Sequence, residues 1–294
     1  MTTLRDKPVL KAATRPVLRY HGGKWMLAPW IIGHFPAHTV YVEPYGGGAS
    51  VLLRKARAKM EVYNELDGQV ANVFRVLRDP VMCARLTELI VLTPFSRTEF
   101  DLSYELSDDP VEQARRTIAR GFMGMSTRGT SGGHRTGFRY SDTAGSTAEK
   151  VWMRYPDRIA AVASRLTGVV IENRPALEVI AKMDAKADAP EVLYYGDPPY
   201  VHDTRQPGSH WQRAYKFEMT DDDHRELAAV LHSVKGMVVV SGYPSELYDE
   251  IYGDWERVTK TAHIEGAQTR TECLWLSPRV SEQVPRLDFE RGGK

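Results

Sequence analysis

The sequence contains very little cysteine, with only Cys83 and Cys273 in 294 residues. Two cysteines so far apart exclude a disulfide framework and the paired spacing of a zinc site, and they are typical of a reducing cytosol. The chain also has no run of 18 apolar residues and no apolar segment near its N-terminus, so we expect neither a membrane span nor a secretory signal. The formal net charge is only +1, which by itself favours no class of charged partner.

The charge is nevertheless distributed unevenly along the chain. Between residues 115 and 158 there are nine Lys or Arg and three Asp or Glu, a net of +6 that leaves −5 for the remainder. Such a segment is typical either of a solvated surface or of a basic patch that contacts nucleic acid. The composition, 42% hydrophobic and 26% charged, is that of a globular protein with room for one large domain or a domain with a second lobe.

The order of short apolar runs and helical patterns predicts an α/β fold. Strand-like runs occur in segments 40–50, 61–67, 169–173, 192–200, 236–244 and 272–278. Helical composition or spacing occurs in segments 51–60, 68–80, 176–183 and 221–234.

The middle of the chain interrupts this alternation. Helices are predicted at about 96–106 and 110–122, and a long Gly-, Ser- and Thr-rich loop or hairpin at 126–147. We therefore predict an insert at about 78–167 within the α/β sheet.

Several motifs lie where predicted strands end or helices begin. The segment "EPYGGGAS" follows the first strand, and its glycines let the backbone approach a ligand, although the spacing is not G-x-G-x-x-G. Glu65 ends the next strand, where an acid in an open α/β sheet hydrogen-bonds ribose hydroxyls. Lys24 in "RYHGGKWML" precedes a predicted helix, and Asn173 ends a later strand. These features indicate a site for a cofactor that contains a nucleoside but no diphosphate.

A further strand end is occupied by Asp197-Pro198-Pro199-Tyr200. Prolines cannot donate to a sheet ladder, so this strand stops at once. A strand ending in a turn would account for these residues taken alone. Their place at the same edge of the sheet as the glycine-rich turn favours a functional interpretation, because ligands of open α/β sheets bind beyond the carboxyl ends of the strands.

In these motifs and their order, the chain resembles the DNA adenine methylase (Dam-type) family of S-adenosylmethionine-dependent DNA amino-methyltransferases. The resemblance is carried by "RYHGGK", "VEPYGGGAS", "VYNELDGQVANVFRVLRD", "VIEN", "DPPY" and "TRTECLWLS". It covers about residues 20–80 and 165–278 and implies a Rossmann-like methyltransferase sheet with an inserted, mainly helical and loop-rich DNA-recognition lobe. The implied division is 1–77 for the cofactor-binding part, 78–167 for the target-recognition insert and 168–294 for the catalytic part.

The resemblance also implies which residues hold the cofactor, S-adenosylmethionine. The residues that shape or close the pocket around its methionine part would be Tyr20, Gly23, Lys24, Glu43, Pro44, Tyr45, Gly46, Gly48 and Asp197. Glu65 would accept the ribose hydroxyls, where the family often has Asp. Asn173 would contact the adenine amino group of the cofactor, where many members have Asp.

The same resemblance gives the DPPY residues a catalytic role. The lone pair of an exocyclic amine is delocalised into the base, so methylation needs two acceptors for its two hydrogens. The Asp197 carboxylate and the Pro198 carbonyl would be these acceptors, and Pro199 would help to fix the extended backbone. Tyr200 would stack on a base extruded from the duplex. Extrusion of a base costs on the order of a few kcal/mol, and this stacking would offset part of that cost.

The insert is expected to contact double-stranded DNA through Arg128, His134, Arg135 and Arg139, which lie in or near its Gly-rich stretch. The expected protein is a monomer in the cytoplasm of a bacterium or a phage-infected host. A restriction endonuclease partner would suit such a protein, but no motif indicates one.

Two other functions stay open at this point. Cytosine-N4 methylation needs the same acceptor geometry, and a member of the fold that binds DNA without catalysis would keep most of the motifs. A metal site is not expected, because His202, His210 and His224 have no ligand spacing with nearby carboxylates.

Overall fold

The computed structural model describes residues 13–132, 134–139, 148–186, 191–204, 215–263 and 269–283. Within these ranges seven strands form one sheet in the order β3-β2-β1-β4-β5-β7-β6. The strands are β1 (Val40–Glu43), β2 (Met60–Asn64), β3 (Val170–Glu172), β4 (Val192–Gly196), β5 (Met237–Gly242), β6 (Glu256–His263) and β7 (Thr269–Leu276). The first five are parallel to one another, and β7 runs antiparallel to both β5 and β6.

This topology places a crevice at the carboxyl ends of β1 and β4. Strand β1 has β2 on one side and β4 on the other. The chain first adds β2 and β3 on one side of β1 and then crosses over to add β4 and β5 on the other side. Such a switch point is where open α/β sheets bind ligands, because the loops on its two sides diverge. The glycine-rich turn after β1 and the DPPY segment after β4 therefore meet at the same crevice.

Alternating side chains of the strands build two hydrophobic cores. One face of the sheet, with Val42, Tyr194 and Val240, packs against α9 (Ala176–Lys186), α10 (Asp221–Ser233) and α11 (Glu246–Ile251). The other face, with Tyr41 and Tyr195, packs against α1 (Ala28–Ile32) and α12 (Pro278–Ser281), and its core continues into α2 (Gly68–Arg78). The sheet is thus covered on both sides, as its mostly parallel strands require.

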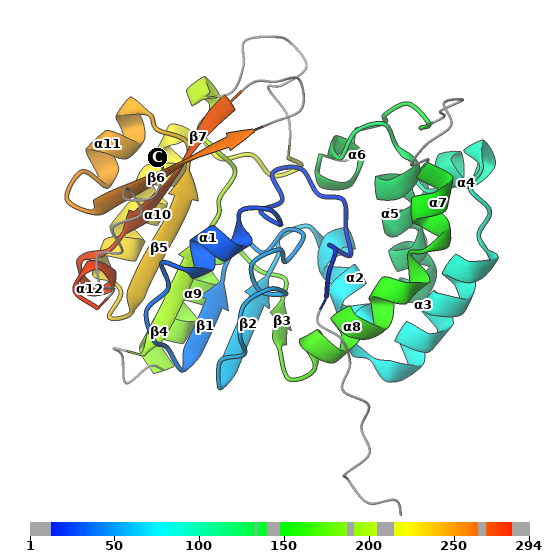
Figure 1. Cartoon of the computed structure of the whole chain (residues 1–294), viewed down its shortest axis with the longest axis horizontal. Helices are drawn as coiled ribbons and strands as arrows, with labels where there is room; N and C mark the ends of the chain where they lie inside the picture. The colour runs from blue at the N-terminus through cyan, green and yellow to red at the C-terminus, as the bar shows by residue number, and fades with distance from the viewer. Residues whose placement is uncertain are drawn as a thin grey trace, which may run out of the picture.

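A helical lobe lies beside the sheet (Figure 1). Its helices are α3 (Pro80–Leu92), α4 (Arg97–Leu102), α5 (Pro110–Met123), α6 (Arg128–Ser131), α7 (Ala148–Met153) and α8 (Pro156–Leu166). Phe74 of α2 and Ile118 of α5 belong to one continuous core, so the lobe is packed on the sheet domain without a separate linker.

Ion pairs fix the same lobe to the amino ends of the strands. The buried Glu61 carboxylate of β2 accepts from Lys55 at 2.9 Å and from Arg165 of α8 at 2.5 Å. The Arg57 guanidinium donates to three carbonyls at the end of α8, those of Ser164, Arg165 and Thr167. These contacts satisfy helix-end acceptors that would otherwise need water or a cap.

Most predicted elements are confirmed, with two corrections. The helix expected after the glycine-rich turn, at 51–60, is wrong: residues 51–54 form turns and residues 55–59 are irregular before β2 begins at Met60. The reason is that Lys55 turns inward to Glu61, which brings the chain back to the sheet at once. Strand β6 was not expected, because its sequence "ERVTKTAH" is mostly polar and it is stabilised by pairing with β7.

The insert also differs in detail from the expected pattern. The helix expected at 96–106 is shorter, at Arg97–Leu102, and the Gly-rich stretch contains the short helix α6 and then an extended segment at 134–139. Of that stretch, Gly133 and residues 140–147 lie outside the described residues.

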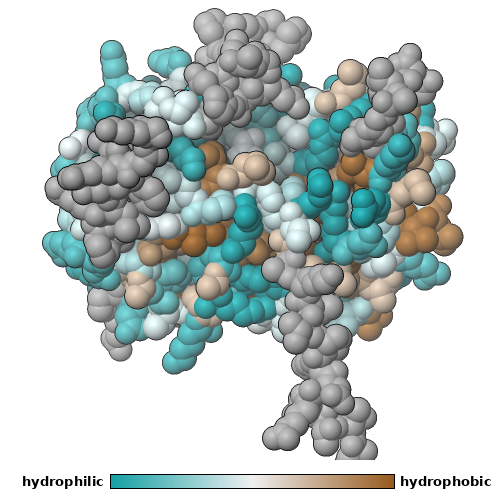
Figure 2. Space-filling view, in the orientation of Figure 1, coloured by the Kyte–Doolittle hydropathy of each residue, from teal (hydrophilic) through white to brown (hydrophobic). Residues whose placement is uncertain are grey.

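The described surface mixes hydrophilic and apolar residues, with an apolar area at the outer edge of the helical lobe (Figure 2). Large exposed apolar side chains on α3 include Val81, Val91 and Leu92. None of the described helices is long and apolar enough to cross a lipid bilayer.

Candidate active site

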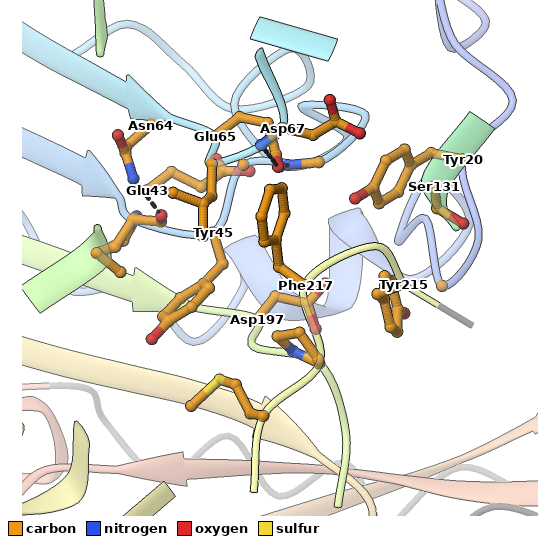
Figure 3. Close-up of a pocket in the computed structure, with 18 of the residues that line it drawn as sticks. Tyr20, Glu43, Tyr45, Asn64, Glu65, Asp67, Ser131, Asp197, Tyr215 and Phe217 are labelled. Carbon is orange, nitrogen blue, oxygen red and sulfur yellow. Dashed lines mark hydrogen bonds between the residues drawn. The ribbon is translucent and has the colours of Figure 1, made fainter. Parts of the chain in front are cut away.

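A cavity of about 290 Å³ lies at the carboxyl ends of the strands, at the crevice set by the topology. Its lining consists of residues 20–24, 43–48, 50–51, 64–67, 175–177 and 215–219, together with Ser131, Tyr195, Asp197, Pro199, Asp223 and Glu226. Figure 3 shows Tyr20, Tyr45, Tyr215 and Phe217 arranged around this space with Glu65 and Asp197. Its size suits a small organic ligand.

The glycine-rich turn is shaped by close contacts with aromatic rings. A Cβ atom on Gly46 would lie 2.1 Å from the ring of Tyr63, so no larger residue fits there without movement. Gly47 has a φ of +47°, a conformation that glycine adopts without strain. The Tyr63 hydroxyl donates to the Gly47 carbonyl at 2.7 Å, which holds the turn against β2.

Glu65 connects this turn with the N-terminus of α2. One carboxylate oxygen accepts from the Gly47 amide at 2.9 Å and the other from the Asp67 amide at 2.8 Å. Burial raises the pKa of Glu65 to about 7, although these backbone hydrogen bonds oppose the shift. Asp67 in turn caps α2 by accepting from the Gln69 amide. The two acids therefore present fixed acceptors along one wall of the cavity.

Glu43 is a second buried acid of the cavity, at 2% exposure. It accepts from the Tyr41 hydroxyl at 2.8 Å and from the Leu52 amide at 3.1 Å. Burial raises the pKa of Glu43 to about 8, and the Asp197 carboxylate adds to the shift.

The cavity as a whole is acidic. Among the described residues, its lining contains two lysines and the seven carboxyl residues Glu43, Glu65, Asp67, Asp197, Glu218, Asp223 and Glu226. Even with Glu43 and Glu65 protonated, the five other acids outnumber the two lysines. Such a lining favours a ligand with positive charge, because an ionised carboxylate in a partly desolvated site attracts a cation more strongly than it would in water.

Lys24 joins the cavity to the DPPY segment. Its ammonium lies 2.9 Å from the Asp197 carboxylate and 4.6 Å from the centroid of the Tyr200 ring, and it donates to the Gly22 carbonyl. Burial lowers the pKa of Lys24, but the carboxylates of Asp197 and Glu272 outweigh this effect and raise it overall. Lys24 is therefore a positive charge held at Asp197.

Asp197 is oriented by a residue that the sequence did not single out. The Ser241 hydroxyl at the end of β5 donates to the same Asp197 oxygen at 2.8 Å. Tyr200 is also held in place: its hydroxyl donates to Glu272, and its ring meets that of Tyr243 edge to face at 4.5 Å. The ring is only 8% exposed, since Lys24 and Tyr243 pack on it.

The structure brings together most of the site residues predicted from the sequence. Cavity-lining residues among them are Tyr20, Gly23, Lys24, Glu43, Pro44, Tyr45, Gly46, Gly48, Glu65, Asp197 and Pro199. Pro198 and Tyr200 are not in the lining, and Tyr200 contacts Tyr243 and Glu272.

Asn173 is placed differently from the other predicted cofactor residues. Its amide nitrogen donates to the carbonyls of Glu65 at 2.6 Å and Leu66 at 2.9 Å, and the side chain does not line the cavity. The nearby Pro175, Ala176 and Leu177 do line it. The amide nitrogen of Asn173 thus holds the 65–67 turn, and a contact of its side-chain oxygen with the cofactor stays a prediction.

The sequence missed a segment that closes the cavity. Residues 215–219 contribute Tyr215, Lys216 and Phe217 to the lining, and Lys216 bonds through its amide to the Ser131 carbonyl of α6. The aromatic pair in "YKF" was the available signal, but nothing in the sequence places it opposite the glycine-rich turn. Ser131 itself also lines the cavity, so the helical lobe reaches the site.

The four predicted DNA-binding residues all lie on the helical lobe. Arg128 is on α6, and His134, Arg135 and Arg139 are in the extended segment that follows. His134 and Arg135 are exposed, and Arg135 forms an ion pair with Asp101 and packs over a tyrosine ring.

The described residues contain no group of three or more His, Cys, Asp or Glu side chains arranged to hold a metal ion. His202 is exposed and His224 is buried on α10, whereas His210 lies outside the described residues.

The fold and this site define a Rossmann-like methyltransferase. Residues 20–270 match the model of the D12 class N6 adenine-specific DNA methyltransferase family, and because this match spans most of the sequence, the chain belongs to that family. It is therefore an enzyme that methylates N6 of adenine in DNA, and no observation favours cytosine as the target. No curated protein matches the chain.

Proposed function

We propose that the cavity binds S-adenosylmethionine and that Asp197 and Pro198 prepare the target adenine for methylation. The observation that carries this proposal is that Asp197 belongs both to the DPPY segment and to the lining of the acidic cavity. The excess of acids over lysines in the lining suits the positive sulfonium and ammonium groups of this cofactor. Membership of a methyltransferase family independently implies this methyl donor.

Within the cavity, each wall has an assigned part. Glu65 and Asp67 face the ribose hydroxyls, because their oxygens are fixed by backbone amides and still have lone pairs to accept hydrogen bonds. Tyr45, Leu177 and Phe217 provide the apolar surface for the cofactor base. Asn173 acts indirectly, through the turn that carries Glu65.

The chemistry at the other end of the cavity follows from the acceptors. The cofactor supplies an electrophilic methyl group. The Asp197 carboxylate and the Pro198 carbonyl accept the two N6 hydrogens, so that the nitrogen lone pair is free to attack. In this transfer N6 would form its bond to the methyl group as the methyl–sulfur bond breaks, and the neutral thioether would be the leaving group. N6 would then carry the positive charge and lose one proton. Asp197 accepts this proton directly or passes it to water.

Lys24 marks the place of the target amine. Its ammonium already donates to Asp197 while lying on the Tyr200 ring, which is the arrangement required of the adenine amino group. The lysine therefore withdraws when the base enters, and the base then stacks on the face of the Tyr200 ring that Lys24 had covered. Stacking of this kind contributes about 1–3 kcal/mol in single-strand recognition and offsets part of the cost of base flipping.

The helical lobe, residues 78–167, acts as the target-recognition insert between the catalytic segments 1–77 and 168–294. Its Arg128, His134, Arg135 and Arg139 contact double-stranded DNA at a specific sequence. The enzyme acts as a monomer in the cytoplasm of a bacterial cell or phage-infected host, where its substrate DNA is found.

The test is nucleoside analysis of DNA incubated with the protein and labelled S-adenosylmethionine. Wild-type protein is expected to yield N6-methyladenine, and Asp197→Ala to yield none while retaining cofactor binding by calorimetry. The exposed Asp254 serves as a matched control, since Asp254→Asn leaves the cavity untouched. Full activity of Asp197→Ala would overturn the mechanism, and N4-methylcytosine would overturn the assigned base.

A further inference from the structure

Strand β7 contains a buried glutamate for which the mechanism above has no task. Glu272 is 7% exposed and is not part of the cavity lining. An isolated ionised carboxylate is costly to bury, so a buried glutamate needs partners that hold it. One such partner belongs to the DPPY segment: the Tyr200 hydroxyl donates to Glu272 Oε2 at 3.0 Å.

The sheet register explains how Glu272 reaches Tyr200. Strand β7 pairs antiparallel with β5, with Cys273 opposite Gly242, so Glu272 lies beside the point where the chain leaves β5. The first residue after β5 is Tyr243, whose ring meets the Tyr200 ring at 4.5 Å with an interplanar angle of 79°. Tyr200 follows β4, so residues from three adjacent strands of the sheet meet at one ring.

A third layer continues outward from the same cluster. The Arg270 guanidinium, also on β7, lies 5.1 Å from the centroid of the Tyr243 ring. Cation–π contact with the guanidinium fixes the orientation of Tyr243, which in turn limits rotation of Tyr200.

The charged groups around Glu272 shift its pKa in opposite directions. Burial raises the pKa of Glu272, and the Lys24 ammonium opposes this shift more strongly than any other group, whereas Asp197 adds to it. Lys24 therefore lies in the field of two carboxylates, one at the reaction site and one behind the tyrosine ring.

These contacts constrain different motions of the Tyr200 side chain. The hydroxyl lies on the long axis of the ring, so a hydrogen bond there fixes the direction in which the ring points. The edge-to-face contact with Tyr243 fixes the plane of the ring about that axis. A ring held in both respects before DNA arrives loses little conformational freedom when a base stacks on it, which is the requirement for a preorganised site.

We propose that Glu272 is a positioning residue for adenine methylation: its carboxylate holds the Tyr200 hydroxyl and thereby fixes the ring on which the target base stacks. The inference rests on the proposed function in one respect, the contact between Tyr200 and the target base. Glu272 itself does not touch the cofactor or the reacting atoms.

A double-mutant cycle tests this proposal. Tyr200→Phe removes only the hydroxyl, Glu272→Leu removes its acceptor, and the double variant removes both. Each single variant is expected to lower kcat on DNA by roughly tenfold, the order typical of one hydrogen bond to a charged group. The double variant is expected to be no slower than the slower single variant, because both changes break the same contact. The KM for S-adenosylmethionine is expected to be unchanged in all three proteins.

Two further variants separate positioning from a general structural effect. Glu272→Gln keeps an acceptor oxygen for the Tyr200 hydroxyl and is expected to restore kcat to within about threefold of wild type. Glu256→Gln, on the exposed strand β6, is the matched control and is expected to behave as wild type. Denaturant unfolding of the same proteins measures whether Tyr200 and Glu272 are coupled in stability, independently of methyl transfer.

The outcomes are distinct. Coupling in kcat together with rescue by glutamine supports the proposal. Coupling in stability with fully multiplicative losses in kcat would show that the contact is only structural and would overturn it, as would wild-type kcat in Glu272→Leu. If wild-type protein made no methylated adenine, or Asp197→Ala were fully active, the proposed function would fail first, while the unfolding measurements would still report on the contact.

Discussion

The close approach of Gly46 to Tyr63 makes Gly46→Ala the sharpest test of how the cavity is built. The added Cβ would lie 2.1 Å and 2.4 Å from two ring atoms of Tyr63, whereas carbon atoms pack at about 3.5–4.0 Å. Either the ring or the turn must therefore move by more than about 1 Å. The ring is fully buried and its hydroxyl is bonded to the turn, so we expect the turn to move.

The cost can be divided into stability and binding. Overpacking of a well-packed core costs about 1–3 kcal/mol, and we expect Gly46→Ala to lower the free energy of unfolding by about that amount. Displacement of the turn also shifts the Gly47 amide away from Glu65, to which it donates at 2.9 Å. Loss of this one contact would weaken the binding of S-adenosylmethionine by about tenfold or more, which corresponds to a binding free energy of roughly 1.4 kcal/mol.

The assay combines denaturant unfolding with calorimetric titration of S-adenosylmethionine. Gly68→Ala is the matched control, because a Cβ there meets only the Asn173 side chain at an ordinary 3.5 Å. If Gly46→Ala matched Gly68→Ala in both stability and cofactor Kd, the turn would not be shaped by Tyr63 and the reasoning would be refuted.

Three further predictions concern the acids and the helical lobe. Glu43 has a pKa of about 8 against an ordinary 4.5, so the folded protein retains its proton to higher pH than the unfolded chain; its stabilising effect is complete below about pH 4.5 and is lost as the pH rises through 8. The free energy of unfolding of wild type relative to Glu43→Gln should therefore fall by a few kcal/mol across that pH window, because each pKa unit corresponds to about 1.4 kcal/mol. A difference between the two proteins that stays constant with pH in denaturant titrations would contradict this. Ser241→Ala removes the 2.8 Å hydrogen bond to Asp197 and should lower kcat by about tenfold with an unchanged cofactor Kd, whereas wild-type turnover would exclude Ser241 as an orienting group. Replacing Arg135 and Arg139 with Ala should weaken DNA binding and reduce the slope of log Kobs against log salt by about 1–2; an unchanged slope would remove both from the interface.

The local sequence determined the elements and chemistry of the strand ends. The glycine-rich turn after β1, Glu65 after β2 and Asp197-Pro198-Pro199-Tyr200 after β4 were all readable, because turn residues and strand-ending prolines act through local backbone sterics. The alternation of strands and helices then placed these ends at one edge of a sheet. The family resemblance gave them their roles, and the family match confirmed the reaction.

The tertiary structure decided which side chains meet. Ser241 bonds to Asp197 across 44 residues of sequence, and Glu272 bonds to Tyr200 across 72, and both contacts follow from strand register in the sheet. The amide nitrogen of Asn173 donates to two carbonyls of the 65–67 turn, a contact that the sequence did not indicate. Burial, register and side-chain rotamers are set by the packing of distant segments, so no local pattern could have shown that Lys24 lies between Asp197 and the ring of Tyr200.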